Sequence, residues 1–252
     1  MNPLPHTIDE VIARMDAIIA HSIETSSRLG YFAALYRRVT IEVKKNIALG
    51  TFTNPELLAK LAVTFAGRYF DAYELYQNNE RPTAPWEVAF GASKRRYPII
   101  LQHLLLGMNA HINLDLAIAS ADTSPGIDIL GLKQDFMQIN AILASQIPVV
   151  LKAINKSSPF IGLISFFYKN TEEKVTHFSL DLARAYSWLL AEDLAVADMP
   201  EREKRITQTI GEVRLLAEKL LHAKGLVKLL IFVVAIAESN NIPKNIKALM
   251  KN

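Results

Sequence analysis

Residues 95–121 read RRYPIILQHLLLGMNAHINLDLAIASA, and this stretch decides the fold. When the residues after Pro98 are placed on a helix at about 100° per residue, apolar side chains point in every direction. A helix that is apolar on all sides belongs in the interior of a protein. Gly107 lies near its middle, where the lack of a side chain would let another helix or a ligand approach the backbone closely. We therefore predict a buried central helix over about residues 98–121.

The central segment also carries polar groups, which are costly to bury without partners. Gln102, Asn109 and Asn113 lie on one side of the predicted helix, within about 40° of one another. His111 and Asp115 lie one turn apart on nearly the opposite side. These five residues are therefore candidates for a functional site inside the protein.

Hydrophobic periodicity favours helices along the rest of the chain, and no segment shows the alternation typical of a strand. No internal repeat or flexible linker divides the sequence. We predict an all-α fold, a single-domain multi-helix bundle over residues 1–252 that packs around the central helix. A third helix should begin at Pro55 and a short one near Trp86. The other predicted helices cover about residues 8–30, 31–46, 128–154, 159–168, 172–194, 201–223 and 226–238.

Composition excludes several classes of function. Half of the residues are hydrophobic and 21% are charged, which is enough apolar surface for a folded core. The chain has no cysteine, so disulfides, thiolate catalysis, iron–sulfur clusters and cysteine-based zinc sites are excluded. The formal net charge is +3, and the tight basic cluster at residues 94–96 has no interleaved aromatic residues. We therefore expect no nucleic-acid partner.

Targeting segments and membrane spans have recognisable patterns in a sequence. The first residues of this chain, MNPLPHTIDE, lack the basic start and apolar stretch of a signal peptide. The longest apolar run, Leu229–Ala237, is closed by Lys228 and Glu238. This run is much shorter than the roughly 18 residues that cross a bilayer. We therefore expect a cytoplasmic protein with no membrane span.

Several segments resemble one protein family. QHLLLGMNAHINLDL at residues 102–116 resembles the signature of the bacterial family known as domain of unknown function 5995. FAGRYFDAYEL at 65–75, Trp86, DFMQIN at 135–140 and LARAYSWLLAEDLA at 182–195 resemble the other landmarks of that family, in the same order. The resemblance extends over most of the chain and implies a shared helical fold and a shared polar helix. It implies no activity.

Two interpretations of His111 and Asp115 remain open. In the first, they form a buried hydrogen-bonded pair that ties neighbouring helices together. In the second, they form a site in which the carboxylate orients the imidazole for acid–base catalysis. Clustered amide, imidazole and carboxylate groups inside an apolar helix favour the second interpretation. It makes His111, Asp115, Asn109 and Asn113 the candidate catalytic residues.

A divalent metal ion is a further possibility, because a histidine and a carboxylate one turn apart can bind one ion. His111 and Asp115 supply only half of a zinc shell, so at least one more ligand must come from another helix. The sequence offers Asp71, His177 and Asp181. Oxygen-rich ligands would favour manganese, magnesium or iron over zinc. The sequence identifies no other cofactor.

Other charged residues lie in strongly apolar surroundings, on the third helix and on the late helix that contains Arg184. Ion pairing would explain them. If both helices pack on the central one, Arg68 or Arg184 could instead hold an anionic group of a substrate, because a guanidinium binds such groups at two points. Trp86 could form one wall of the pocket. The candidate substrate-binding residues are Gln102, Arg68, Asp71, Trp86 and Arg184.

Motifs of the common enzyme classes are missing from the sequence. It contains no Gly-x-Ser-x-Gly nucleophile motif, no phosphate-binding glycine loop, no dinucleotide fingerprint and no His-Glu-x-x-His. Two functions remain open. One is an enzyme that acts on a small, partly apolar molecule in a buried pocket lined by Asn, His and Asp of the central helix. The other is a non-catalytic helical protein that binds such a molecule or a partner.

Overall fold

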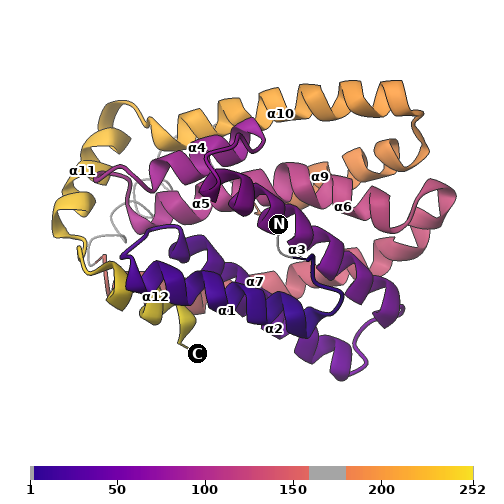
Figure 1. The fold of residues 1–252 in the computed structure, drawn as a ribbon, viewed down its shortest axis with the longest axis horizontal. Helices are drawn as coiled ribbons and strands as arrows, with labels where there is room; N and C mark the ends of the chain where they lie inside the picture. Colours follow the sequence, from indigo (N-terminus) through magenta and orange to yellow (C-terminus); the bar gives the residue numbers. More distant parts are fainter. Residues whose placement is uncertain (1–2, 159–179, 252) are drawn as a thin grey trace.

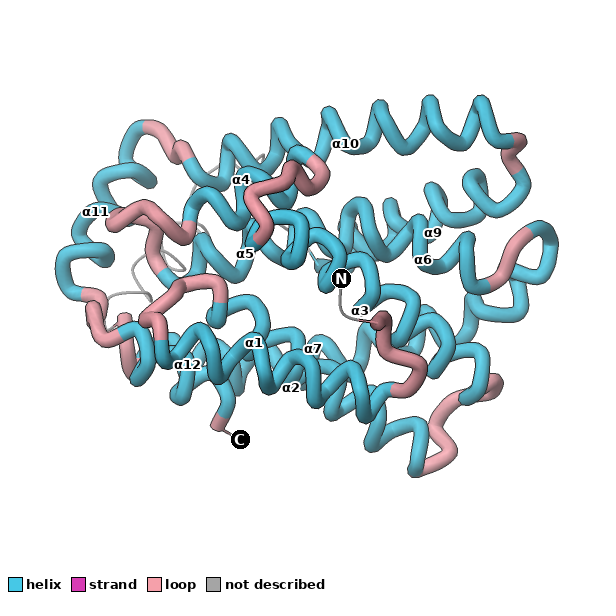
Figure 2. The backbone as a smooth tube through the Cα atoms, viewed as in Figure 1, coloured by secondary structure: helices cyan, strands magenta, loops and turns pink. Residues whose placement is uncertain are grey.

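The computed structural model describes residues 3–158 and 180–251, and this part of the chain is helical with no strand. Figure 2 shows helices joined by loops throughout it. The prediction of an all-α multi-helix fold is therefore confirmed. The predicted helix over residues 159–168 and the first residues of the one over 172–194 lie outside the described residues. A single domain over residues 1–252 stays a prediction.

The structure divides the described chain into α-helices and two shorter helical turns of other types. The turns are η1, a π-helical turn (His111–Asp115), and η2, a 3-10 helix (Gly126–Leu132). The α-helices are α1 (Ile8–Glu24), α2 (Gly30–Ala48), α3 (Pro55–Gln77), α4 (Ala84–Ala92), α5 (Ile100–Ala110), α6 (Leu116–Thr123), α7 (Lys133–Asn155), α9 (Leu180–Val196), α10 (Met199–Leu221), α11 (Gly225–Ala237) and α12 (Ile242–Met250).

Most of these helices run along one long axis and form a bundle (Figure 1). α1, α2 and α12 pack together at one edge, and α10 lies along the opposite edge. α5, α6 and α9 lie between the two edges, and α11 crosses one end of the bundle. Helices from both ends of the chain therefore enclose its central segment.

The boundary between the first two helices differs from the prediction. α1 ends at Glu24 instead of continuing to Gly30, and Ser26 just beyond it adopts a left-handed φ of 51° that does not continue a helix. Gly30 instead begins α2, where a Cβ atom would lie 2.6 Å from Ile246 and 2.7 Å from Ser22. Glycine is therefore needed here for the close packing of α1, α2 and α12, and not to end a helix.

The predicted central helix is present. α5, η1 and α6 form one continuous helical stretch, Ile100–Thr123, that packs against α2, α3, α4, α9 and α10. Every residue over 109–121 is buried. The stretch begins two residues after Pro98, because Ile99 is still extended. The apolar side chains on all sides of this helix therefore pack against neighbouring helices.

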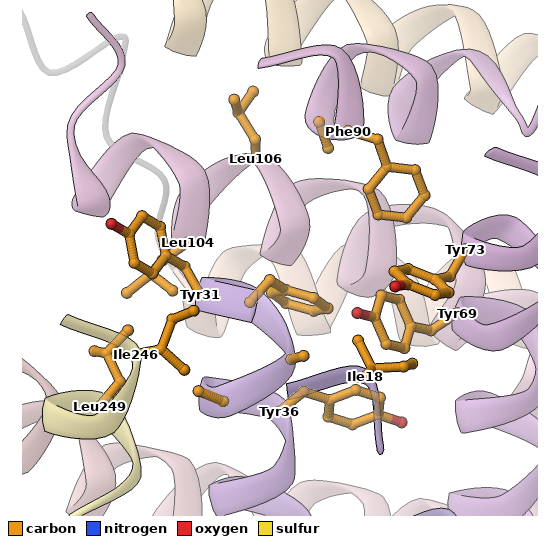
Figure 3. Close-up of a cluster of buried hydrophobic side chains, with 14 of the residues drawn as sticks. Ile18, Tyr31, Tyr36, Tyr69, Tyr73, Phe90, Leu104, Leu106, Ile246 and Leu249 are labelled. Carbon is orange, nitrogen blue, oxygen red and sulfur yellow. The ribbon is translucent and has the colours of Figure 1, made fainter. Parts of the chain in front are cut away.

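The buried apolar residues form two clusters that divide the central helix along its length, with α5 in the first and η1 and α6 in the second. The first joins α1, α2, α3, α4, α5 and α12, and Figure 3 shows the neighbouring rings of Tyr36, Tyr69, Tyr73 and Phe90 in it. The second joins α3, α6, α7, α9 and η2 around the buried ring of Phe136. α3 contributes to both clusters and therefore links the two halves of the core.

The prediction of no membrane span is wrong. The described helices Ile100–Thr123 and Gly126–Asn155 are long and apolar enough to cross a membrane. The bent pair Met199–Leu221 and Gly225–Ala237 would add a third if counted as one span. The prediction considered only uninterrupted apolar runs, whereas a helix of sufficient length can include uncharged polar residues. The expected cytoplasmic location is corrected with it. Of the 18-residue apolar stretch in each helix, 83% is buried inside the protein in the first helix and 17% in the second.

Gly107 on α5 provides a test of the packing around the central helix. A Cβ atom at this position would lie 2.4 Å from the ring of Phe32 on α2, so Gly107→Ala should force the two helices apart. We expect this change to lower the free energy of unfolding by about 1–3 kcal/mol in chemical denaturation. Gly211 on α10 is the matched control, because no atom lies within 4 Å of an added Cβ. Gly211→Ala should be neutral or stabilise the helix by up to about 1 kcal/mol. Equal losses in both variants would contradict the close contact.

Candidate functional site

His111 and Asp115 form a buried pair in the π-helical turn η1. His111 Nδ1 lies 3.1 Å from Asp115 Oδ2, and the two side chains are only 3% and 2% exposed. The contact itself is the one that the sequence spacing predicted. The π-helical turn was not predicted from the sequence. Such turns interrupt a regular helix, and they occur frequently at functional sites.

The Asp115 carboxylate accepts hydrogen bonds from three helical segments. Trp86 on α4 donates its Nε1–H to Oδ2 at 2.8 Å. Arg68 on α3 donates its Nε–H to Oδ1 at 3.2 Å and supplies a compensating positive charge. His111 is the third donor. The structure therefore brings together four of the residues singled out from the sequence, and their hydrogen bonds hold the buried carboxylate in a fixed orientation.

The contact with Asp115 determines the protonation of His111. Because the carboxylate accepts at Nδ1, the proton lies on Nδ1 and the lone pair on Nε2. Burial lowers the pKa of His111 below 6.5, and the nearby Asp115 only partly opposes this effect. Nε2 is buried and has no hydrogen-bond partner among the described residues. The neutral imidazole can therefore accept a proton or a hydrogen bond from another molecule.

Aromatic rings surround the His111 imidazole. The Phe65 ring stacks on it with the ring centroids 3.6 Å apart and the planes 7° from parallel. The Tyr36 ring meets its edge with a centroid separation of 4.5 Å. Tyr69 lies further away, at 6.1 Å, and burial raises the pKa of its phenol. Sequence reasoning missed these rings as site residues, although Phe65 and Tyr69 share the face of α3 that carries Arg68.

The three amide side chains of the central helix have a different role. Asn109 Nδ2 donates to the backbone carbonyl of Val213 on α10 at 2.9 Å, and Asn113 Nδ2 donates to Asn109 Oδ1 at 3.0 Å. Gln102 Nε2 donates to the carbonyl of Leu220, also on α10, at 2.8 Å. Their side of the helix therefore binds α10, while the opposite side carries His111. No hydrogen bond joins these amides to His111 or Asp115 in the described part of the chain.

The metal interpretation gains no support from the described residues. They contain no group of three or more His, Asp or Glu side chains that could hold a metal ion. Asp71 and Asp181 lie at the surface. Partial burial raises the pKa of Asp71, and the positive charges of Arg14 and Arg68 only partly oppose this effect. His177 lies outside the described residues.

A largely apolar cavity of about 340 Å³ lies beside His111. It is bounded by α2, α3, α5, α6, α7, α9 and η1, with Tyr36, Phe65 and Met108 in its wall. Ile147 and Leu151 on α7 also line it, yet they are 45% and 38% exposed. The cavity therefore opens to the surface beside α7. Its size lies at the lower end of the range for small-molecule sites.

Arg184 on α9 lines the same cavity as His111. Its side chain is almost fully buried, and burial lowers its pKa to about 9. The guanidinium donates to Asn140 Oδ1 and to the backbone carbonyl of Phe136, and it lies 4.3 Å from the centre of the Phe136 ring. It therefore remains positively charged at neutral pH, although both of its hydrogen-bond partners among the described residues are neutral.

The fold and the buried pair define an all-helical protein with a polar central helix and a small-molecule-sized cavity. The chain belongs to the family of unknown function DUF5995, whose model matches residues 8–223. This match confirms the family resemblance of the sequence and includes every residue of the site described above. No curated protein and no solved structure matches the chain.

The buried neutral imidazole predicts a pH dependence of stability. The pKa of His111 is lower in the folded chain than its ordinary value of 6.5, so the unfolded chain binds the proton more tightly. The contribution of the neutral His111 to the free energy of unfolding is therefore fully present above pH 6.5, and it is lost progressively as the pH falls below 6.5. Between pH 6.5 and 5, the wild type should lose up to about 1.4 kcal/mol per pH unit more than His111→Gln in chemical denaturation.

A matched control for this measurement is His103 on α5. It is also buried, and desolvation lowers its pKa to about 3. His103→Gln should therefore also lose less unfolding free energy than the wild type as the pH falls below 6.5. If His103→Gln reduces it and His111→Gln does not, His111 is charged in the folded protein and the description of the site is wrong.

Proposed function

We propose that the protein binds a small, partly apolar molecule in the cavity beside α7, and that His111 accepts a proton or a hydrogen bond from it. The observation that carries this proposal is the buried Nε2 atom of His111, which has no partner among the described residues although its imidazole lines the cavity. A bound molecule with an O–H or N–H group would satisfy it.

The energetic cost of the arrangement supports a functional role. A buried acceptor without a partner costs about 1–3 kcal/mol, and unpartnered groups of this kind are rare in folded proteins. His111 is nevertheless held firmly, through Asp115 and the donors Trp86 and Arg68. A pair needed only for stability would not require an orientation that leaves Nε2 without a partner beside a cavity.

The enzymatic form of the proposal makes His111 a general base. A base must be unprotonated at the working pH and must be oriented by a further group. The lowered pKa of His111 meets the first requirement, and its hydrogen bond to Asp115 meets the second. The aromatic rings around the imidazole would keep water away from the reacting group. In this form, Asp115 is a positioning residue and does not exchange protons with the substrate.

The second candidate function is non-catalytic binding, and the cavity lining favours it. Apart from His111 and Arg184, the lining is dominated by aliphatic and aromatic side chains. Such a surface provides affinity through burial of apolar area, and only a few polar groups are needed for orientation. The two functions share the same cavity and differ in whether the bound molecule is converted.

The location of the site can be tested with the uncharged fluorescent probe 1-naphthylamine, whose size matches the cavity. We expect the wild type to bind the probe with saturable enhancement of its fluorescence. Val150→Trp adds volume to the cavity wall and should weaken binding at least tenfold, because the space is no longer free. Leu215→Trp on the exposed face of α10 is the control and should bind normally. Normal binding by Val150→Trp, with the fold intact by circular dichroism, would show that the site lies elsewhere.

The role of His111 can be tested with a matched pair of ligands, 4-butylphenol and 4-butylanisole. They share an apolar body, but only the phenol can donate to Nε2. The wild type should bind the phenol about 3- to 10-fold more tightly, as one net hydrogen bond allows, and His111→Phe should remove the preference. An equal affinity of the wild type for both ligands would contradict the proposed acceptor.

A further inference from the structure

We propose that the natural ligand of the cavity is an amphiphilic hydroxy monocarboxylate, such as a medium-chain hydroxy fatty acid, whose carboxylate pairs with Arg184 and whose hydroxyl group donates to His111 Nε2. Its chain would lie in the apolar part of the cavity, between α5 and α7. This inference rests on the proposed binding function of the cavity and adds the chemical class of the ligand.

The charge of Arg184 has no direct counter-ion in the described part of the chain. Its hydrogen-bond partners, Asn140 Oδ1 and the Phe136 carbonyl, are both neutral. Asp181, nearly one turn earlier on α9, acts on it electrostatically but forms no ion pair with it. A buried charge is costly unless an opposite charge and hydrogen bonds compensate it. An anionic ligand group would supply that compensation.

The guanidinium also has donor capacity left for a ligand. Arginine carries five N–H donors, and a carboxylate can accept two of them in parallel. Only Nε and Nη2 of Arg184 are used within the described residues, and Nη1 has no hydrogen-bond partner there. Because Arg184 lines the cavity, a ligand carboxylate in the cavity can reach the free donor.

The charge of the lining favours a single negative charge on the ligand. Arg184 is the one charged side chain among the described lining residues, since His111 is neutral. One guanidinium balances one carboxylate, whereas a phosphate monoester would bring a second negative charge without a partner. The cavity therefore fits a monoanion better than a phosphorylated molecule.

The shape of the cavity favours a chain. The lining follows α7 from Phe136 to Ile154, roughly 27 Å along the helix axis at 1.5 Å per residue. Its volume of about 340 Å³ corresponds to on the order of ten non-hydrogen atoms at roughly 30 Å³ each. Arg184 donates to the carbonyl of Phe136 at one end of the α7 lining, and the exposed Ile147 lies nearer the other end of that lining. A carboxylate at Arg184 would therefore place the apolar tail toward the surface opening.

The experiment compares decanoate with 1-decanol at pH 7.5 by isothermal titration calorimetry, at concentrations below micelle formation. The two probes share a ten-carbon chain and differ in the head group. The wild type should bind decanoate at least tenfold more tightly, as expected for charge-assisted hydrogen bonds. Arg184→Gln should lose at least tenfold in decanoate affinity and keep its decanol affinity within about threefold. Arg202→Gln, which removes the same charge on α10, should behave as the wild type in both titrations.

The possible failures are distinguishable. Equal affinity of the wild type for decanoate and decanol would overturn the carboxylate assignment and leave the proposed binding function intact. Failure of both ligands and of the neutral fluorescent probe would overturn the binding function itself. If Arg184→Gln does not fold, ¹³C NMR of carboxyl-labelled decanoate on the wild type decides: a pKa of the bound carboxyl below that of the free acid supports the pairing, and an unchanged or raised pKa overturns it.

Discussion

The structure depends on the buried carboxylate of Asp115. It is almost fully removed from solvent, so its charge must be compensated within the protein. Arg68, Trp86 and His111 provide that compensation from α3, α4 and η1. One carboxylate therefore fixes three segments relative to one another and also sets the proton position on the imidazole. Removing it would affect both the packing of the bundle and the chemistry of the site.

The central helix separates two kinds of polar interaction. Asn109 and Gln102 bind backbone carbonyls of α10 and are satisfied within the protein. On the other side, His111 has one nitrogen held by Asp115 and one without a partner among the described residues. From the sequence, these polar groups were candidates for one site, with Asn109 and Asn113 as catalytic residues and Gln102 as a substrate-binding residue. The structure supports a structural role for the amides, and a binding or catalytic role for the histidine is proposed.

Part of this arrangement could be predicted from the sequence because it depends on local periodicity. Apolar residues on every side of residues 98–121 predicted a buried helix, and the spacing of His111 and Asp115 predicted their contact. The bond from Trp86 to Asp115 could not be predicted, because it depends on how the loop before α4 returns to the core. The cavity depends on side-chain packing between helices distant in sequence. Membrane-spanning length was missed because apolar runs were measured without the polar residues that a long helix tolerates.

The central claim is that His111 is neutral, with its proton on Nδ1 and a free lone pair on Nε2. Long-range ¹H–¹⁵N NMR of the histidine rings tests it directly, because the two nitrogens have different shifts in each protonation state. At pH 7.5 the His111 ring should show a protonated Nδ1 and an unprotonated Nε2, and a ligand that carries a hydroxyl group should shift Nε2 alone. An imidazolium at pH 7.5, or a neutral ring protonated on Nε2, would contradict the account.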